Sequence, residues 1–346
     1  MPKAGWLFLA AAACGAAHAA ESEQCPNRTE LPPTVNLRVD NDLFGVSDQD
    51  QGYSNGVQLM LVSPDLKDLA DDPCLPRMAR LVNRHLRAIQ PEGGFDEQNM
   101  VFTLNHAIYT PEDKARKDLI QDDRPYAAAL LVGLGYNARK GNRLQTTQLK
   151  LGWLGPSARG EEMQKAVHKI VGDDEFQGWD NQLGDEPLVM LQHERMHRFG
   201  WGTGQWTWDA ITHYGGALGN YRTFLNGGAE LRFGRHLLED FGSTPLRPAG
   251  ENTAPGGAIQ AGGPVRFNGF LTTDVRWVGR DITLDGNTWK DSHSVDRRKV
   301  VGYAGYGVAI QKGRWKFALA RYHSTREFNG QDESPVFGSF TISRAL

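Results

Sequence analysis

Residues 265–277 read Val-Arg-Phe-Asn-Gly-Phe-Leu-Thr-Thr-Asp-Val-Arg-Trp, so that large apolar side chains alternate with polar ones. Successive side chains of a β-strand point to opposite faces of the sheet. Val265 and Phe267 therefore share one face of an extended chain, and Arg266 and Asn268 share the other. This period of two predicts a strand with one apolar and one polar face.

The same alternation recurs along most of the chain, in about twelve segments of strand length separated by turn signals. The segments lie near 35–43, 53–63, 99–109, 126–137, 144–154, 187–197, 205–219, 221–234, 264–278, 299–311, 314–323 and 336–344. Several contain about ten residues, the length of a tilted strand that crosses a bilayer. An even number of antiparallel strands can close into a barrel that has no exposed edge. We therefore predict an all-β fold, an antiparallel transmembrane β-barrel of about twelve strands.

Two other architectures share this alternation, a soluble β-sandwich and a lipocalin-like barrel in the periplasm. The mean hydropathy of −0.49 does not decide between them and a membrane barrel. Barrel strands alternate lipid-facing with lumen-facing residues, which dilutes the hydropathy signal. The chain also ends on Leu346 rather than on an aromatic residue. Periodicity alone leaves these alternatives open.

The first twenty residues have the features of a secretory signal peptide. Lys3 supplies a positive start, residues 6–17 form a short apolar stretch, and Ala17-His18-Ala19 offers a small-x-small cleavage site. We expect export, with residues 1–20 removed as a signal peptide and residues 21–346 forming one outer-membrane β-barrel domain.

Composition narrows the function classes further. The formal net charge is −3, which gives no reason to expect nucleic-acid binding. Of the three cysteines, Cys25 and Cys74 remain after signal removal, and they can pair in an oxidising compartment. Neither belongs to a metal-type cluster.

One segment interrupts the strand pattern. Residues 160–172 place Met163, Val167 and Ile170 at helical spacing, and Gly172 can end the helix. This single amphipathic helix carries His168, the side-chain type that most often acts as a general base near neutral pH.

The motif His193-Glu194-Arg195-Met196-His197 matches the zinc-peptidase pattern H-E-x-x-H. That chemistry needs a helix, on which the two histidines share a face. The surrounding residues predict a strand, in which the histidines lie about 13 Å apart at roughly 3.3 Å per residue. One zinc ion cannot join both, so we do not expect this activity.

Two polar clusters follow predicted strands. Asn41-Asp42, with Asp48 and Asp50 behind it, gathers hard oxygen ligands of the kind that bind calcium, although the spacing is not that of an EF-hand loop. A basic loop with Lys114, Arg116 and Arg124 can hold lipid phosphates at a membrane surface. Each cluster by itself is also compatible with a solvated loop.

Taken in order, several motifs resemble the outer-membrane lipid A 3'-O-deacylase family. They are Asn41-Asp42, Tyr53-Ser54-Asn55-Gly56, Asp123-Arg124-Pro125-Tyr126-Ala127, residues 164–172 and Gln177-Gly178-Trp179-Asp180-Asn181-Gln182-Leu183. The resemblance runs from about residue 35 to the C-terminus. It implies a twelve-stranded barrel in the outer membrane of a Gram-negative bacterium. It also implies a calcium-dependent esterase that removes the 3'-linked acyloxyacyl chain of lipid A.

Carried over to this chain, the resemblance places the catalytic residues at Asn41, Asp42, Ser54 and His168. It implies Ca²⁺ as the cofactor, with Asp42 and Asp174 as ligands, and substrate contacts from Lys114, Arg116 and Arg124. Asp174 stands where the family often has Glu. The implied mechanism is attack by water activated by His168, with calcium polarising the ester carbonyl. A covalent Ser54 intermediate is the competing version, and we prefer water because no nucleophile elbow is expected around Ser54.

Two other functions remain for comparison. An outer-membrane phospholipase would share the calcium and the histidine but would act on glycerophospholipid. A passive pore would need neither a helix that bears His168 nor the Asn41-Asp42 cluster. We expect a membrane-embedded monomer that binds lipid A or lipopolysaccharide and no nucleic acid.

Overall fold

The computed structural model describes residues 32–41, 52–171, 174–237, 240–242 and 263–346. The expected signal peptide, Cys25 and Asp42 lie outside the described residues.

Within these ranges, twelve antiparallel strands close into one barrel, as the alternation predicted. The strands are β1 (Thr34–Asn41), β2 (Gly52–Val62), β3 (Glu97–Thr110), β4 (Ala127–Lys140), β5 (Arg143–Leu154), β6 (Glu186–Trp201), β7 (Trp206–Gly219), β8 (Arg222–Arg235), β9 (Arg266–Asp281), β10 (Val300–Lys312), β11 (Trp315–Ser324) and β12 (Val336–Ala345). Each strand pairs with its neighbours in sequence, and β12 pairs with β1 to complete the circle. Closure satisfies the hydrogen-bonding groups that an open sheet would expose at its edges.

The apolar face of the strands points outward. In β9, Leu271 is 61% exposed and Val275 is 54% exposed, whereas the alternate residues Asp274 and Arg276 are buried in the lumen. A soluble sandwich or a lipocalin-like barrel would bury its apolar face and expose its polar one. The observed orientation therefore excludes both alternatives and suits a barrel surrounded by lipid.

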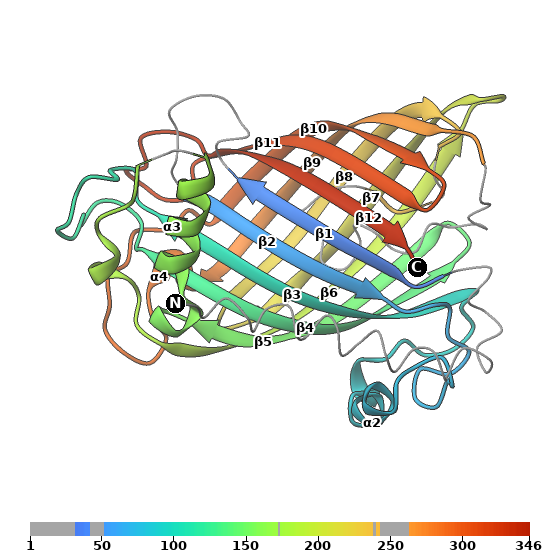
Figure 1. The fold of residues 1–346 in the computed structure, drawn as a ribbon, viewed down its shortest axis with the longest axis horizontal. Helices are drawn as coiled ribbons and strands as arrows, with labels where there is room; N and C mark the ends of the chain where they lie inside the picture. Colours follow the sequence, from blue (N-terminus) through green and yellow to red (C-terminus); the bar gives the residue numbers. More distant parts are fainter. Residues whose placement is uncertain (1–31, 42–51, 172–173, 238–239, 243–262) are drawn as a thin grey trace.

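The loops at the two ends of the barrel carry its short helices (Figure 1). These are α2 (Arg77–His85), α3 (Gly160–Val171) and α4 (Ile282–Asp285), with 3₁₀ turns at Arg87–Ile89, Pro156–Ala158 and Trp179–Asn181. α3 confirms the predicted helix, whereas α2 and α4 lie between predicted strands, where no helix was predicted. In the described part of the chain, no helix has both the length and the apolar character needed to span a membrane.

At one end of the barrel, where β1 begins and β12 ends, the segment 63–96 folds back against the outside of the wall. Leu66, Leu69 and Leu75 pack there on Met100 of β3 and Tyr136 of β4. Cys74, which lies beside this cluster, is disulfide-bonded. We call this the α2 end. The opposite end carries α3 and α4 and is called the α3 end (Figure 1).

Charged pairs fill much of the lumen. Arg232 forms hydrogen bonds to both carboxylate oxygens of Asp209, at 2.7 and 2.6 Å, and His213 lies 2.7 Å from a carboxylate oxygen of Asp274. Buried charges are tolerated when they are paired and hydrogen-bonded in this way. The lumen is therefore a packed polar core.

Candidate active site

Helix α3 covers the outside of the barrel wall at the α3 end. Ile108 of β3 and Ala128 of β4 are paired neighbours on the outer face, and both are fully buried. Leu130, the next outward residue of β4, is 37% exposed. Ile108 and Ala128 form one apolar cluster with Tyr126, Ala158, Phe176 and Trp179. Ala158, Phe176 and Trp179 therefore shield this patch from its surroundings.

The start of α3 requires a glycine. A Cβ atom at Gly160 would lie 2.4 Å from the Cβ of Ala128 and 2.8 Å from the Trp179 ring, which is closer than van der Waals contact allows. On the opposite, exposed side of the helix, Lys165 donates a hydrogen bond to Glu161 at 2.7 Å. This bond raises the pKa of Lys165, and the pair supports the helix modestly.

His168 lies in the last turn of α3 and is 1% exposed. Its Nδ1 is 2.5 Å from the backbone carbonyl oxygen of Asp174, and its ring meets the Phe176 ring edge-on at 5.7 Å. A carbonyl oxygen can only accept a hydrogen bond, so Nδ1 carries the proton. In the neutral ring the lone pair then lies on Nε2, which is the arrangement that a general base needs.

No role was predicted from the sequence for the residues that anchor α3 to the following segment. Trp179 donates a hydrogen bond through Nε1 to Gln164 at 2.9 Å, and both side chains are buried. Phe176 packs between this anchor and His168. The motifs at 164–172 and Gln177–Leu183 contain Gln164 and Trp179, whereas Phe176 lies between the two motifs.

Asn41, at the end of β1, belongs to the same outer face of the wall. The alternate residues Arg38 and Asp40 line the lumen, so Asn41 points outward. Its side chain donates a hydrogen bond to Asn55 of β2 at 2.5 Å, and both residues are buried.

Strand register connects Asn41 to the patch under α3. Asn41 pairs with Asn55, Asn55 with Ile108, and Ile108 with Ala128. These four residues form one continuous row across β1–β4, and all four are buried although they lie on the outer face. The row begins at the predicted catalytic Asn41 and ends beneath the helix that carries His168. We call it the outer row.

Of the predicted catalytic residues, Ser54 can be placed only in part and Asp42 cannot be placed. Ser54 falls within β2, where the register shifts between Tyr53 and Asn55, and its side chain lies outside the description, as does Asp42. Residues 52–56, Gly-Tyr-Ser-Asn-Gly, do match the letters of G-x-S-x-G. A nucleophile elbow, however, is a sharp strand-to-helix turn, whereas these residues lie inside a strand.

Of the two predicted metal ligands, Asp42 and Asp174, only Asp174 lies within the described residues. Asp174 is exposed at its side chain, and it contacts His168 through its backbone carbonyl. Among the described residues, no group of three His, Cys, Asp or Glu side chains could hold a metal ion. The described residues alone do not make a calcium site, and the cofactor stays a prediction.

The basic loop packs against the segment that follows α3. Gln177 donates its backbone N–H to the carbonyl oxygen of Lys114 at 2.9 Å, and the Lys114 ammonium lies 5.6 Å from the centre of the Phe176 ring. Arg116 is exposed on the same loop. The structure therefore brings Lys114 to the neighbourhood of His168 and leaves the Arg116 side chain at the surface.

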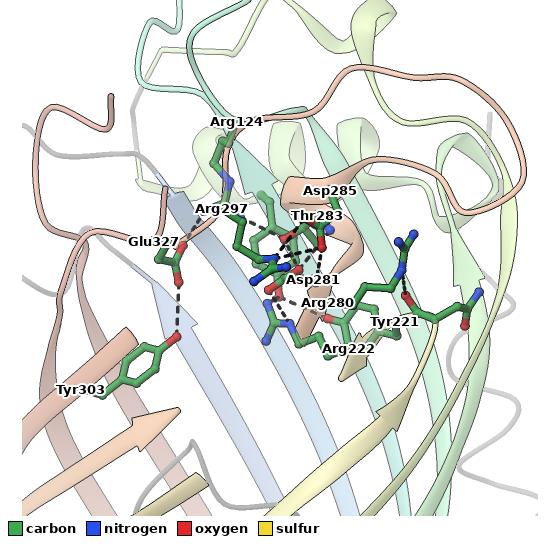
Figure 2. A network of polar contacts seen from close by, with 12 residues as sticks. Arg124, Tyr221, Arg222, Arg280, Asp281, Thr283, Asp285, Arg297, Tyr303 and Glu327 are labelled. Atoms are coloured by element: carbon green, nitrogen blue, oxygen red, sulfur yellow. Dashed lines mark hydrogen bonds and ion pairs between the residues drawn. The ribbon is translucent and has the colours of Figure 1, made fainter. Parts of the chain in front are cut away.

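Arg124, in contrast, is part of a polar network in the mouth of the barrel (Figure 2). It is 2% exposed, forms a salt bridge of 3.1 Å with Glu327 and donates to Thr283 of α4 at 3.2 Å. Its guanidinium also lies 4.9 Å from the centre of the Tyr109 ring. These contacts hold the loops of the α3 end together across the lumen. The guanidinium of Arg124 is therefore already bound to groups of the protein.

The H-E-x-x-H motif lies in β6, as predicted. By strand alternation His193 and His197 point outward, whereas Glu194 is buried in the lumen. The three side chains thus lie on opposite sides of the wall, and the zinc-peptidase arrangement is absent.

Comparison with known proteins finds a matching family. Residues 6–346 match the family model described as outer membrane protein LpxR. The structure is similar to that of LpxR from Salmonella typhimurium, with a TM-score of 0.69 and 18% identity over 90% of this chain and 100% of that chain. The β domain of the Bordetella autotransporter BrkA has a TM-score of 0.42 and 11% identity over 92% of this chain and 100% of that one. Curated protein sequences contain no significant match.

Proposed function

Because the chain belongs to the LpxR family of outer membrane proteins, we propose that it is an esterase that removes the 3'-linked acyloxyacyl chain of lipid A. The protein lies in the outer membrane of a Gram-negative bacterium, embedded as a barrel. The substrate, the chemistry and the cofactor are inferences from the site.

One observation carries the proposal. His168 is buried on the outer face of the wall, with Nδ1 bound to the Asp174 carbonyl at 2.5 Å. A site on the outer face, rather than in the lumen, can receive an ester whose acyl chains remain in the bilayer. This location favours a lipid substrate over a soluble one, and it argues against a passive pore, which has no use for a helix that buries a histidine against its outside.

The proposed reaction follows from the protonation of the imidazole. Nε2 of His168 accepts a proton from water as the water oxygen attacks the ester carbonyl. The imidazolium then returns the proton to the leaving 3' oxygen, so that a sugar hydroxyl and a free acyloxyacyl acid are formed. The Asp174 carbonyl keeps the imidazole oriented and stabilises its positive charge. We prefer this route to a Ser54 acyl intermediate because residues 52–56 do not form a nucleophile elbow.

Asn41 and the basic loop supply the remaining functions. We assign the Asn41 amide, oriented by Asn55, to the developing oxyanion. Lys114 and Arg116 are the candidate contacts for the phosphates of lipid A. Calcium, which we propose is held by Asp42 with Asp174, would polarise the ester carbonyl when bound.

The decisive experiment is mass spectrometry of lipid A from cells that express the wild type, His168→Ala or His85→Ala. His85 is a matched control, because it also lies in the last turn of a helix with Nδ1 2.9 Å from a backbone carbonyl oxygen, but at the α2 end. We expect loss of the 3' acyloxyacyl group with the wild type and with His85→Ala. His168→Ala should lower the rate by about 10²–10⁴-fold, the usual contribution of a general base.

Two outcomes would count against the assignment. Unchanged lipid A in all three strains, with calcium supplied, would rule out deacylation. Accumulation of lysophospholipid instead would establish the phospholipase alternative.

The cofactor has its own test on the purified enzyme. A chelator should abolish deacylation, and added Ca²⁺ should restore it. Full activity in the presence of the chelator would refute the metal role of Asp42 and Asp174 while leaving the role of His168 intact.

A further inference from the structure

A cavity of about 170 Å³ lies in the lumen, behind the wall that carries the outer row. Arg38 and Asp40 of β1 line it, and Asn41 follows them on the outer face of the same strand. The volume is many times the roughly 10–15 Å³ that a single water requires. The cavity can therefore hold a small polyatomic ligand, on the side of the wall opposite to His168.

Positive charge predominates in its lining. The charged described residues there, histidine aside, are Arg38, Lys150, Arg222, Arg276, Asp40 and Glu327. The arginines have carboxylate partners: Arg38 with Asp40 at 3.1 Å, Arg222 with Asp281 at 2.9 Å and Arg276 with Asp274 at 2.8 Å. The carboxylate of Glu327 forms a salt bridge of 3.1 Å with Arg124, in the polar network at the mouth of the barrel (Figure 2).

Lys150 is the cation that these pairings leave uncompensated. Its Nζ donates to the neutral amide oxygen of Gln192 at 3.3 Å, and among the described carboxylates none forms an ion pair with it. The neighbouring charges that act on it are those of Arg38, Arg222 and Arg276, and all three repel an ammonium. A lumenal ammonium in this position is unfavourable unless a counter-ion accompanies it.

We propose that the cavity is a binding site for a small oxyanion of the phosphate type, with Lys150 as its central ligand. Guanidinium groups and an ammonium that converge on one space are the donors that recognise phosphate. A phosphate monoester carries about −1.5 to −2 charges at pH 7, which compensates Lys150 and relieves its repulsion by the arginines. The ligand is either free phosphate or the phosphate of a lipid headgroup.

The test is titration calorimetry on the full-length protein in neutral detergent micelles, with inorganic phosphate injected at constant ionic strength in chloride. Three variants accompany the wild type. Lys150→Met removes the central charge but keeps a stem of similar length, and Lys140→Met makes the same change at the exposed end of β4. Lys114→Met reports any phosphate bound at the basic loop.

We expect one saturable phosphate site in the wild type, in Lys140→Met and in Lys114→Met, and at least tenfold weaker binding in Lys150→Met. Heat-modifiable migration in electrophoresis checks that every variant is folded. Absence of saturable binding in the folded wild type would overturn the proposal. Loss of phosphate binding in Lys114→Met alone would also overturn the proposal, because the phosphate would then bind outside the lumen. Binding unchanged in Lys150→Met would also refute it.

A second measurement separates the two sources of phosphate. Phosphatidic acid in the micelles should compete with inorganic phosphate if a lipid headgroup reaches the cavity. An unchanged phosphate affinity would assign the site to a free anion.

Discussion

The side-chain amide of Asn41 donates a hydrogen bond of 2.5 Å to the amide oxygen of Asn55 on the adjacent strand, and the two residues are only 4% and 5% exposed. Both point to the outside of a barrel whose outer face is mainly apolar. A polar pair in such a position must be covered and internally hydrogen-bonded, because lipid offers no partners. The pair therefore indicates a polar site on the outer face of the wall that is kept away from lipid.

The first prediction concerns this pair. Asn55→Ala removes the acceptor for the Asn41 amide in a buried setting, where loss of a hydrogen-bonding partner costs about 1–3 kcal/mol. We expect lower unfolding stability in denaturant and a drop of roughly tenfold or more in deacylation, since about 1.4 kcal/mol of lost orientation corresponds to tenfold in rate. Asn142→Ala, in the exposed β4–β5 turn, is the control and should change neither. Wild-type activity in Asn55→Ala would remove Asn41 from the proposed oxyanion site.

The second prediction concerns the close contact between the start of α3 and the barrel wall. Gly160→Ala places a Cβ 2.4 Å from that of Ala128, so the helix must move away from the wall and carry His168 with it. A displacement of about 1 Å can cost 10²-fold in rate, and we expect a loss of that order in the lipid A assay. The barrel itself should fold, as shown by heat-modifiable migration. Gly200→Ala meets nothing within 4 Å and serves as the control. Undiminished activity in Gly160→Ala would show that catalysis does not depend on how α3 is seated.

The third prediction separates two roles for Arg124. Breaking a buried ion pair by removing one partner costs about 3–5 kcal/mol, because the other charge stays buried. Arg124→Met should therefore loosen the mouth of the barrel and make the loops at 111–126 and 325–335 sensitive to protease. Arg116→Met, on the exposed part of the same loop, should leave protease resistance unchanged and raise only the KM. If Arg124→Met raised the KM without loosening the loops, Arg124 would be a substrate contact and not a structural one.

The fourth prediction is a pH dependence at the same rim. Partial desolvation of this exposed carboxyl, followed by the charges of Asp123, Asp332, Glu333 and Asp113, raises the pKa of Glu112 above its ordinary value. The folded state then binds this proton more tightly than the unfolded state, so Glu112 costs stability at neutral pH, and the cost disappears as the pH falls below its folded pKa. Glu112→Gln should have a slightly higher Tm than the wild type at pH 8 and an equal Tm near pH 4, about the ordinary pKa of a glutamate. Glu92→Gln, at the α2 end, is the charge-matched control. A difference that does not vary with pH would contradict this account.

Much of the fold could be predicted because its signals are local. The alternation in segments such as 265–277 depends on neighbouring residues alone, and it predicted twelve strands and their closure. The helix at 160–171 was equally visible, since helical spacing also lies within one segment. α2 was missed because only nine residues form it and the segment 64–98 around it has no sustained periodicity.

The candidate site was predictable only in part. Motif order pointed to Asn41 and His168. It did not show that Asn55 accepts a hydrogen bond from the Asn41 side chain, or that the Asp174 carbonyl oxygen binds the His168 ring. Arg124 and Lys114 looked equivalent in a basic loop, yet one is buried in the mouth network and the other lies beside Phe176. Burial and partners of this kind depend on residues that are far away in the sequence.

Export, alternating strands and one histidine-bearing helix could all be predicted from the sequence alone, because each of these follows from composition and spacing within a short segment. Which face of the strands points outward, and what covers that face, became known from the three-dimensional fold. Closure of β12 on β1 turned the apolar face toward lipid and confined Lys150 and the arginines to the lumen. Strand register then aligned Asn41, Asn55, Ile108 and Ala128 into the outer row beneath α3. The row spans 87 positions of the sequence and its register pairs join residues up to 53 positions apart, and such pairings are set by the closed barrel as a whole.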